Sequence, residues 1–106
     1  MKMKYDIDIE KKSIEINLKR IINQVYKLLP SREEGEDWKK PLETIIEELV
    51  GMNSLLKDCQ SVFFTLLCKL QGLFEYDDED DFLVYRRTIF ECLGLLGGIK
   101  DYVISK

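Results

Sequence analysis

Histidine is absent from this chain of 106 residues, which removes the commonest general base and the commonest protein ligand of zinc. A Ser–His or Cys–His nucleophilic pair needs that side chain, so the chain by itself cannot build one. The sequence also contains no glycine-rich phosphate-binding loop and no G-x-S-x-G motif. We therefore expect a protein that is not an enzyme, with no catalytic residues, no cofactor and no metal.

Long apolar runs are missing as well. The densest stretch, residues 62–73, is interrupted by Thr65, Lys69, Gln71 and Gly72, and falls short of a membrane span. The first eight residues hold lysines but neither the apolar core nor the cleavage site of a secretory signal. We expect no membrane association and a cytoplasmic location.

Proline, glycine and cysteine are scarce. Two prolines, six glycines and an apolar content of 45% indicate one globular domain with little linker. The cysteines, Cys59, Cys68 and Cys92, are odd in number and form no C-x-x-C pair. We expect them to be reduced thiols that act as small core residues.

Four segments carry apolar residues at intervals of three and four positions, the spacing of one helix face. The four stripes are Ile14, Leu18, Ile21, Val25 and Leu28; Leu42, Ile45, Leu49, Met52 and Leu56; Val62, Phe63, Leu66, Leu70 and Phe74; and Phe82, Tyr85, Ile89, Leu93, Leu96 and Val103. This pattern predicts an all-α fold, a compact bundle of four main helices in a single domain spanning residues 1–106.

The first predicted helix runs from about residue 13, or one turn earlier, to residue 29. Pro30 is expected to end it, because the residue before a proline disfavours the helical conformation. Ser31 and Glu34 have the spacing of a capping box, so a short helical turn is expected after the proline. Residues 4–10 alternate between polar and apolar, which is compatible with a short extended arm, a strand or a first helical turn.

The second predicted helix ends near residue 56. Asp37 is the expected cap, and Trp38 is expected to fold back onto the end of the bundle as a hydrophobic plug. The third helix, capped by Asp58 or Ser61, is expected to continue to residue 74.

The fourth predicted helix begins near residue 79 and reaches residue 96. The pair Gly97-Gly98 is compatible either with its continuation or with a C-terminal stop that leaves residues 99–106 as a docked tail.

The net charge of −4 is unevenly distributed, with +3 in residues 1–30, −4 in residues 31–60 and −3 in residues 61–106. The acidic balance argues against direct contact with nucleic acid. The acidic stretches 33–37 and 77–81 are compatible with a different role if they share one face. They would then imitate a phosphate track, and the protein would inhibit a nucleic-acid-binding protein.

Pairs of carboxylates also raise an enzymatic alternative. All-helical nucleotide pyrophosphatases of the MazG-like class hold magnesium with E-x-x-E and E-x-x-D motifs on facing helices. Glu33-x-x-Glu36 and Glu75-x-x-Asp78 are similar to these motifs by their letters, but both fall in predicted turns rather than within helices. A calcium-binding EF-hand loop is not matched by the run 77–81, which lacks its glycine and its final glutamate.

The predicted helices leave apolar residues outside their main stripes. On the fourth helix, Leu83, Phe90, Gly94 and Gly97 share a second face about 90° away from the main stripe. This face is either buried because the helix is central, or it is a docking surface for a protein partner or a second copy of the chain. The candidate interface residues are Phe64, Leu83, Arg86, Phe90, Gly94 and Gly97.

Three segments resemble those of small helical proteins carried by bacteriophages and prophages. They are residues 28–35 (LLPSREEG), 37–44 (DWKKPLET) and 85–93 (YRRTIFECL). The resemblance implies a small accessory protein of a phage or mobile element. It assigns no functional residues.

Overall fold

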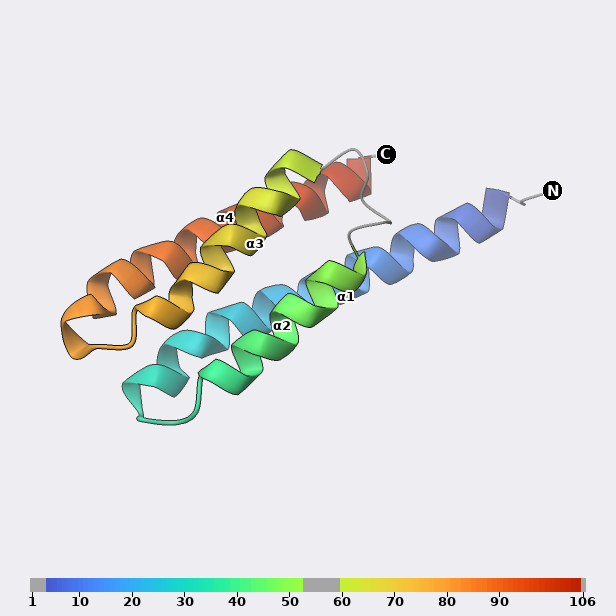
Figure 1. The fold of residues 1–106 in the computed structure, drawn as a ribbon. Helices are drawn as coiled ribbons and strands as arrows, with labels where there is room; N and C mark the ends of the chain where they lie inside the picture. Colours follow the sequence, from blue (N-terminus) through green and yellow to red (C-terminus); the bar gives the residue numbers. More distant parts are fainter. Residues whose placement is uncertain (1–3, 53–59, 106) are drawn as a thin grey trace.

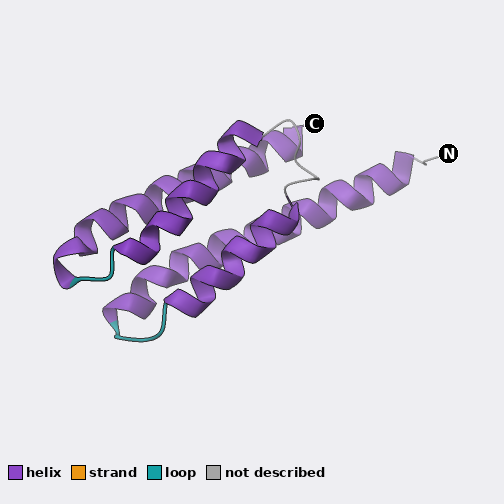
Figure 2. Cartoon of the chain, in the orientation of Figure 1, coloured by secondary structure: helices purple, strands orange, loops and turns teal. Residues whose placement is uncertain are grey.

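The computed structural model describes residues 4–52 and 60–105. Its helices are α1 (Lys4–Glu33), α2 (Lys39–Met52), α3 (Gln60–Gly72) and α4 (Phe82–Ser105), and two 3₁₀ turns, η3 (Leu73–Glu75) and η4 (Glu79–Asp81), join α3 to α4. The helices run up and down in the order α1, α2, α3, α4 around the bundle, and α1 and α4 share the most extensive contact (Figure 1). Because no strand occurs among these residues, the predicted all-α bundle is confirmed (Figure 2).

The core is built from the four predicted stripes. Its buried residues include Leu18, Ile21, Val25, Leu28, Leu42, Ile45, Leu49, Met52, Phe63, Leu66, Leu70, Tyr85, Ile89, Leu96 and Val103. The prediction is wrong for Val62, which is 39% exposed, and Leu73 of η3, which was not part of the stripe, is buried. Cys92 and Ile99 join the core from α4. Leu56 of the second stripe lies outside the described residues.

The prediction that Pro30 ends the first helix is wrong. Helix α1 continues to Glu33, and the backbone N–H of Glu34 still donates to the Pro30 carbonyl at 3.0 Å. A proline in a helix lacks the N–H that would bond to the carbonyl four residues earlier and crowds that carbonyl, but hydrogen bonds donated by later residues can still form. Gly35, with φ 75°, then closes the helix by a Schellman motif. In that motif Glu36 N–H donates to the Ser31 carbonyl and Gly35 N–H to the Arg32 carbonyl.

The extended-arm alternative for residues 4–10 is also wrong, because α1 already begins at Lys4. Adding residues to an existing helix is favourable once the nucleus has formed, whereas a separate strand would need a partner edge. The start of α1, blue in Figure 1, projects beyond the other three helices. The molecule is consequently elongated, measuring 54 × 24 × 19 Å.

The expected start of the second helix is confirmed. Asp37 Oδ1 accepts hydrogen bonds from the backbone N–H groups of Lys39 at 3.1 Å and Lys40 at 3.3 Å, the geometry of an N-cap. Trp38 is buried at the end of the bundle, as predicted.

Helix α3 begins at Gln60, so Ser61 lies within its first turn instead of capping it, and Asp58 lies outside the described residues. Helix α4 begins at Phe82, after the turn η4, and runs through Gly97-Gly98 to Ser105. The glycine pair is therefore not a stop. Ile99 and Val103 beyond it are buried, and this packing stabilises the last two turns. Among the described helices, none has the length and apolar content that crossing a bilayer requires.

Candidate functional site

Five of the candidate interface residues lie on the outer face of α4, defined here as Leu83, Arg86, Phe90, Gly94 and Gly97. Leu83 is 75% exposed and Phe90 is 45% exposed. Residues two positions apart on a helix point to nearly opposite sides, so Leu83 lies opposite the buried Tyr85 and Gly94 opposite the buried Cys92. The face is thus turned away from the core. The alternative, in which this face is buried because α4 is central, does not agree with these exposures.

Arg86 belongs to this face through its contact with Phe90. Its guanidinium carbon lies 5.4 Å from the centroid of the Phe90 ring, one helical turn away. This cation–π contact holds the ring beside a positive charge while leaving much of it exposed. The face therefore combines exposed apolar area with a fixed cation, a composition that suits protein recognition.

Phe64 lies on a different helix from the other candidate interface residues. It is 69% exposed on α3, in an open depression whose described lining also includes Gln60, Ser61, Thr65 and Leu67. The seam between α3 and α4 is instead bridged by the ion pair of Lys69 and Glu91, at 3.6 Å. Phe64 is thus contributed by α3, and the other five candidate residues by α4.

The glycines of α4 are not required by packing inside the molecule. A methyl group added at Gly94, Gly97 or Gly98 would meet nothing within 4 Å. Glycine inside a helix is less favourable than alanine by about 0.5–1 kcal/mol. These positions therefore destabilise the helix without improving its contact with α1 or α3.

A second feature, at one end of the bundle, is centred on Arg32. Its guanidinium carbon lies 4.3 Å from the ring centroid of Tyr85, 5.3 Å from Trp38 and 5.7 Å from Phe82. The same group donates hydrogen bonds to the backbone carbonyls of Tyr76 and, at 2.7 Å, of Asp78. We call Arg32, Trp38, Phe82 and Tyr85 the arginine–aromatic cluster; it ties the end of α1 to the connection between α3 and α4.

Sequence analysis missed Arg32, although a signal was present. Arg32 follows Leu28 by four residues and so continues the first apolar stripe, but the helix was expected to end before it. Tyr85 is buried at the centre of the cluster, and its hydroxyl donates to the Leu28 carbonyl at 3.4 Å. Burial raises the pKa of that hydroxyl well above its ordinary value, and the charge of Arg32 offsets part of the effect.

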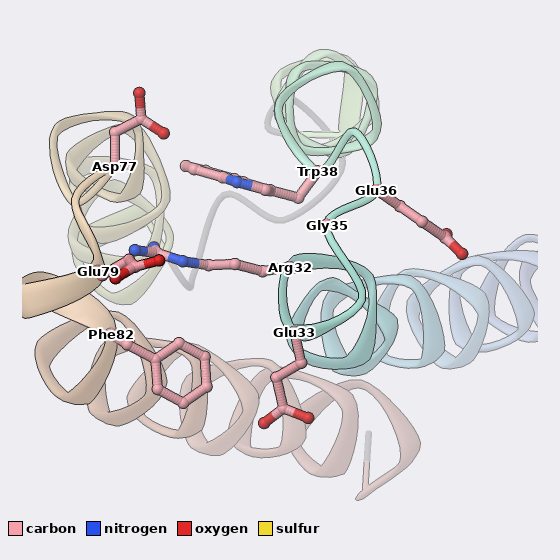
Figure 3. A pocket seen from close by; sticks show the side chains of 8 residues that line it. All are labelled: Arg32, Glu33, Gly35, Glu36, Trp38, Asp77, Glu79 and Phe82. Atoms are coloured by element: carbon pink, nitrogen blue, oxygen red, sulfur yellow. The ribbon is translucent and has the colours of Figure 1, made fainter.

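An open depression of about 450 Å³ adjoins this cluster, and its lining includes Glu33, Glu36, Asp77 and Glu79. The carboxylates of these four residues point in different directions (Figure 3). Asp77 is paired with Lys39 Nζ at 2.7 Å. Within residues 4–52 and 60–105, no three such side chains are grouped so that they could hold a metal ion. Glu33 and Glu36 of the first carboxylate motif thus line this depression, whereas Glu75 and Asp78 of the second motif are not among its described lining residues.

The two described cysteines differ in their surroundings. Cys92 is buried, and burial raises the pKa of its thiol to about 12. The charge of Lys69 lowers this pKa and that of Glu91 raises it, and both effects are smaller than that of burial. Cys68 is exposed, so the expectation that it belongs to the core is wrong. Both are free thiols. Cys59 lies outside the described residues.

Comparisons with protein-family models, with curated proteins and with solved structures gave no match to this chain.

Proposed function

We propose that this chain is a non-enzymatic interaction protein that docks onto a protein partner through the outer face of α4. The observation that carries the proposal is the exposure of Leu83 and Phe90 on one face of a helix whose opposite side is fully committed to the core. Single exposed apolar residues are common, but two large ones aligned on a rigid helix beside a cation form a patch suited to recognition.

The resemblance of three segments to small phage and prophage proteins supports a more specific version of this role. In that version the chain is an accessory factor that binds and modulates a host or phage protein in the cytoplasm. The arginine–aromatic cluster then serves stability, because it fixes the ends of α1 and α4 and so keeps the outer face rigid.

Photo-crosslinking in cells tests the proposal. A photoreactive phenylalanine analogue placed at position 83 should form an adduct with a protein, and the further substitution Phe90→Ser should abolish that adduct. The same analogue at Glu47, an exposed position of α2, is the matched control and should form none. Absence of an adduct at position 83, or its persistence with Phe90→Ser, would contradict docking through this face.

A second candidate function, inhibition of a nucleic-acid-binding protein by acidic mimicry, is favoured by one observation. The two acidic segments lie at the same end of the bundle (Figure 1). Residues 32–40 and 75–81 together hold ten carboxylates against three cations, a formal charge of −7, so the rest of the chain carries +3. Nine of these carboxylates belong to exposed residues, and Asp81 is half-buried.

Binding of a basic, DNA-binding host protein to the immobilised chain tests this second candidate. Capture should be lost as NaCl rises from about 0.05 M to about 0.3 M, because salt screens exposed charges. Added duplex DNA should displace the captured protein. The triple variant Glu79→Gln, Asp80→Asn, Asp81→Asn should weaken capture, whereas Phe90→Ser should not. Capture that is insensitive to salt and to DNA would rule the mimicry out.

A further inference from the structure

A line of residues with regular spacing runs along the whole of α4 and shares Leu83, Phe90, Gly94 and Gly97 with the outer face. Starting from Leu83, steps of four and three residues alternate through Arg87, Phe90, Gly94, Gly97 and Asp101. This is the repeat with which one helix packs along another helix. Apart from the half-buried Gly97, all of these residues are exposed.

In an antiparallel pairing of two α4 helices centred on Gly94, two pairs of positions are complementary, one in charge and one in size. Arg87 and Asp101 are each seven residues from Gly94, on either side of it. Neither forms an ion pair with another residue in the described part of the chain. Phe90 and Gly98 are likewise each four residues from Gly94. The glycines leave open space above the helix, since a methyl group at any of them meets nothing within 4 Å.

We propose that the partner of this face is a second copy of the chain, with the two α4 helices antiparallel about a two-fold axis near Gly94. This inference rests on the proposed function and names its partner. The arrangement places each Phe90 ring over Gly98 of the second copy and each Arg87 opposite Asp101 of the second copy. A parallel pairing would instead set Arg87 against Arg87. The interface is isologous, so every favourable contact occurs twice.

Charge exchange tests the pairing in the full-length chain. Sedimentation equilibrium from about 1 μM to about 1 mM should show a monomer–dimer equilibrium for the native chain. Arg87→Asp alone and Asp101→Arg alone should each raise the dimer dissociation constant by roughly tenfold or more. The double variant should restore it, because both pairs form again with reversed charges. Lys40→Asp, an equal charge change on α2, is the control and should leave dimerisation unchanged.

Cysteine crosslinking tests the position of the axis. In a background with Cys59→Ser and Cys68→Ser, oxidation of Gly94→Cys should give a disulfide-linked dimer, and Glu47→Cys should give none. Circular dichroism of each variant establishes that the helices are retained.

A chain that stays monomeric over the whole range, or a double variant that fails to recover, overturns the second copy as the partner. An adduct from position 83 to a different protein would then leave the proposed function standing. A monomeric chain with no adduct at position 83 would overturn both.

Discussion

Arg32 is the side chain through which α1 and the connection between α3 and α4 are joined. Its planar guanidinium is flanked by three aromatic rings and donates to two backbone carbonyls. Trp38 meets Tyr85 edge to face at 5.0 Å, and Phe82 stacks on Tyr85 at 6.4 Å, so the rings also support one another. One residue therefore satisfies the exposed carbonyls of a turn and closes the end of the hydrophobic core.

Replacing Arg32 by alanine should lower the free energy of unfolding by about 2–3 kcal/mol, because both hydrogen bonds and the ring contacts are lost. Arg32→Lys keeps the charge but not the planar fork, and should recover less than half of the loss. Urea denaturation followed by circular dichroism measures both variants. If the lysine variant matched the native chain, charge alone would explain the stability.

The buried thiol of Cys92 should make stability fall with rising pH. Its pKa is raised from 9.0 to about 12, so between these values the unfolded chain has released the proton while the folded chain retains it. The unfolded state then binds fewer protons, and the contribution to the free energy of unfolding falls by at most about 1.4 kcal/mol per pH unit above pH 9. Below pH 9 the thiol is protonated in both states and contributes no pH dependence.

Urea denaturation at pH 8, 9 and 10 measures this slope. Cys92→Ala should be less stable at every pH, because it leaves a small cavity, but should lose stability less steeply above pH 9. Cys68→Ala, at an exposed position, should keep the native slope. Equal slopes for all three proteins would show that the Cys92 thiol does not titrate differently on unfolding.

At the scale of the elements, the connection between α1 and α2 is determined by local chemistry. The Schellman motif at Gly35 ends α1, and two residues later Asp37 caps α2 with a side-chain oxygen. Pro41 lies in the first turn of α2, where its missing N–H leaves no bond unmade. These features allow a reversal of direction in five residues.

Asp37→Ala should destabilise the protein by about 1 kcal/mol, because two backbone N–H groups of α2 lose their acceptor. Asp37→Asn keeps an oxygen at the same place and should cost only a few tenths of a kcal/mol. Glu36→Ala, in the same loop, is the control and should have no measurable effect. The measurement is the midpoint of urea unfolding; equal shifts for the alanine and asparagine variants would contradict a capping role.

At the scale of the whole molecule, the buried residues of all four helices form one continuous core. Trp38 is part of that core at the end where the arginine–aromatic cluster lies. Because all four helices share one core, no part of the molecule has a core of its own, so unfolding should be cooperative.

We therefore expect the helical signal in circular dichroism and the fluorescence of Trp38 to change with the same midpoint and slope in urea. The two probes report on different regions, since the fluorescence comes from one end of the bundle and the dichroism from every helix. Separate midpoints would show that the chain contains two independent units.

Much of the architecture could be predicted from residue spacing, because a helix face repeats in sequence whatever its neighbours are. The errors occurred where a rule based on neighbouring residues in the sequence did not match the structure of the whole helix or of the bundle. Pro30 removes one hydrogen bond of α1 and crowds the carbonyl four residues earlier, yet the helix continues past it and ends only at the motif around Gly35. Val62 fits the predicted stripe by its spacing but is 39% exposed, whereas Leu73, outside that stripe, is buried.

The sequence by itself determined that the chain forms four amphipathic helices around one core, because the period of the apolar residues leaves no other secondary structure that buries them. Only the tertiary structure decided which of the remaining apolar residues face outward, that Arg32 joins three aromatic rings, and that both acidic segments share one end. Each of these depends on how separate helices are placed against one another, and helix placement is a property of packing rather than of any single segment.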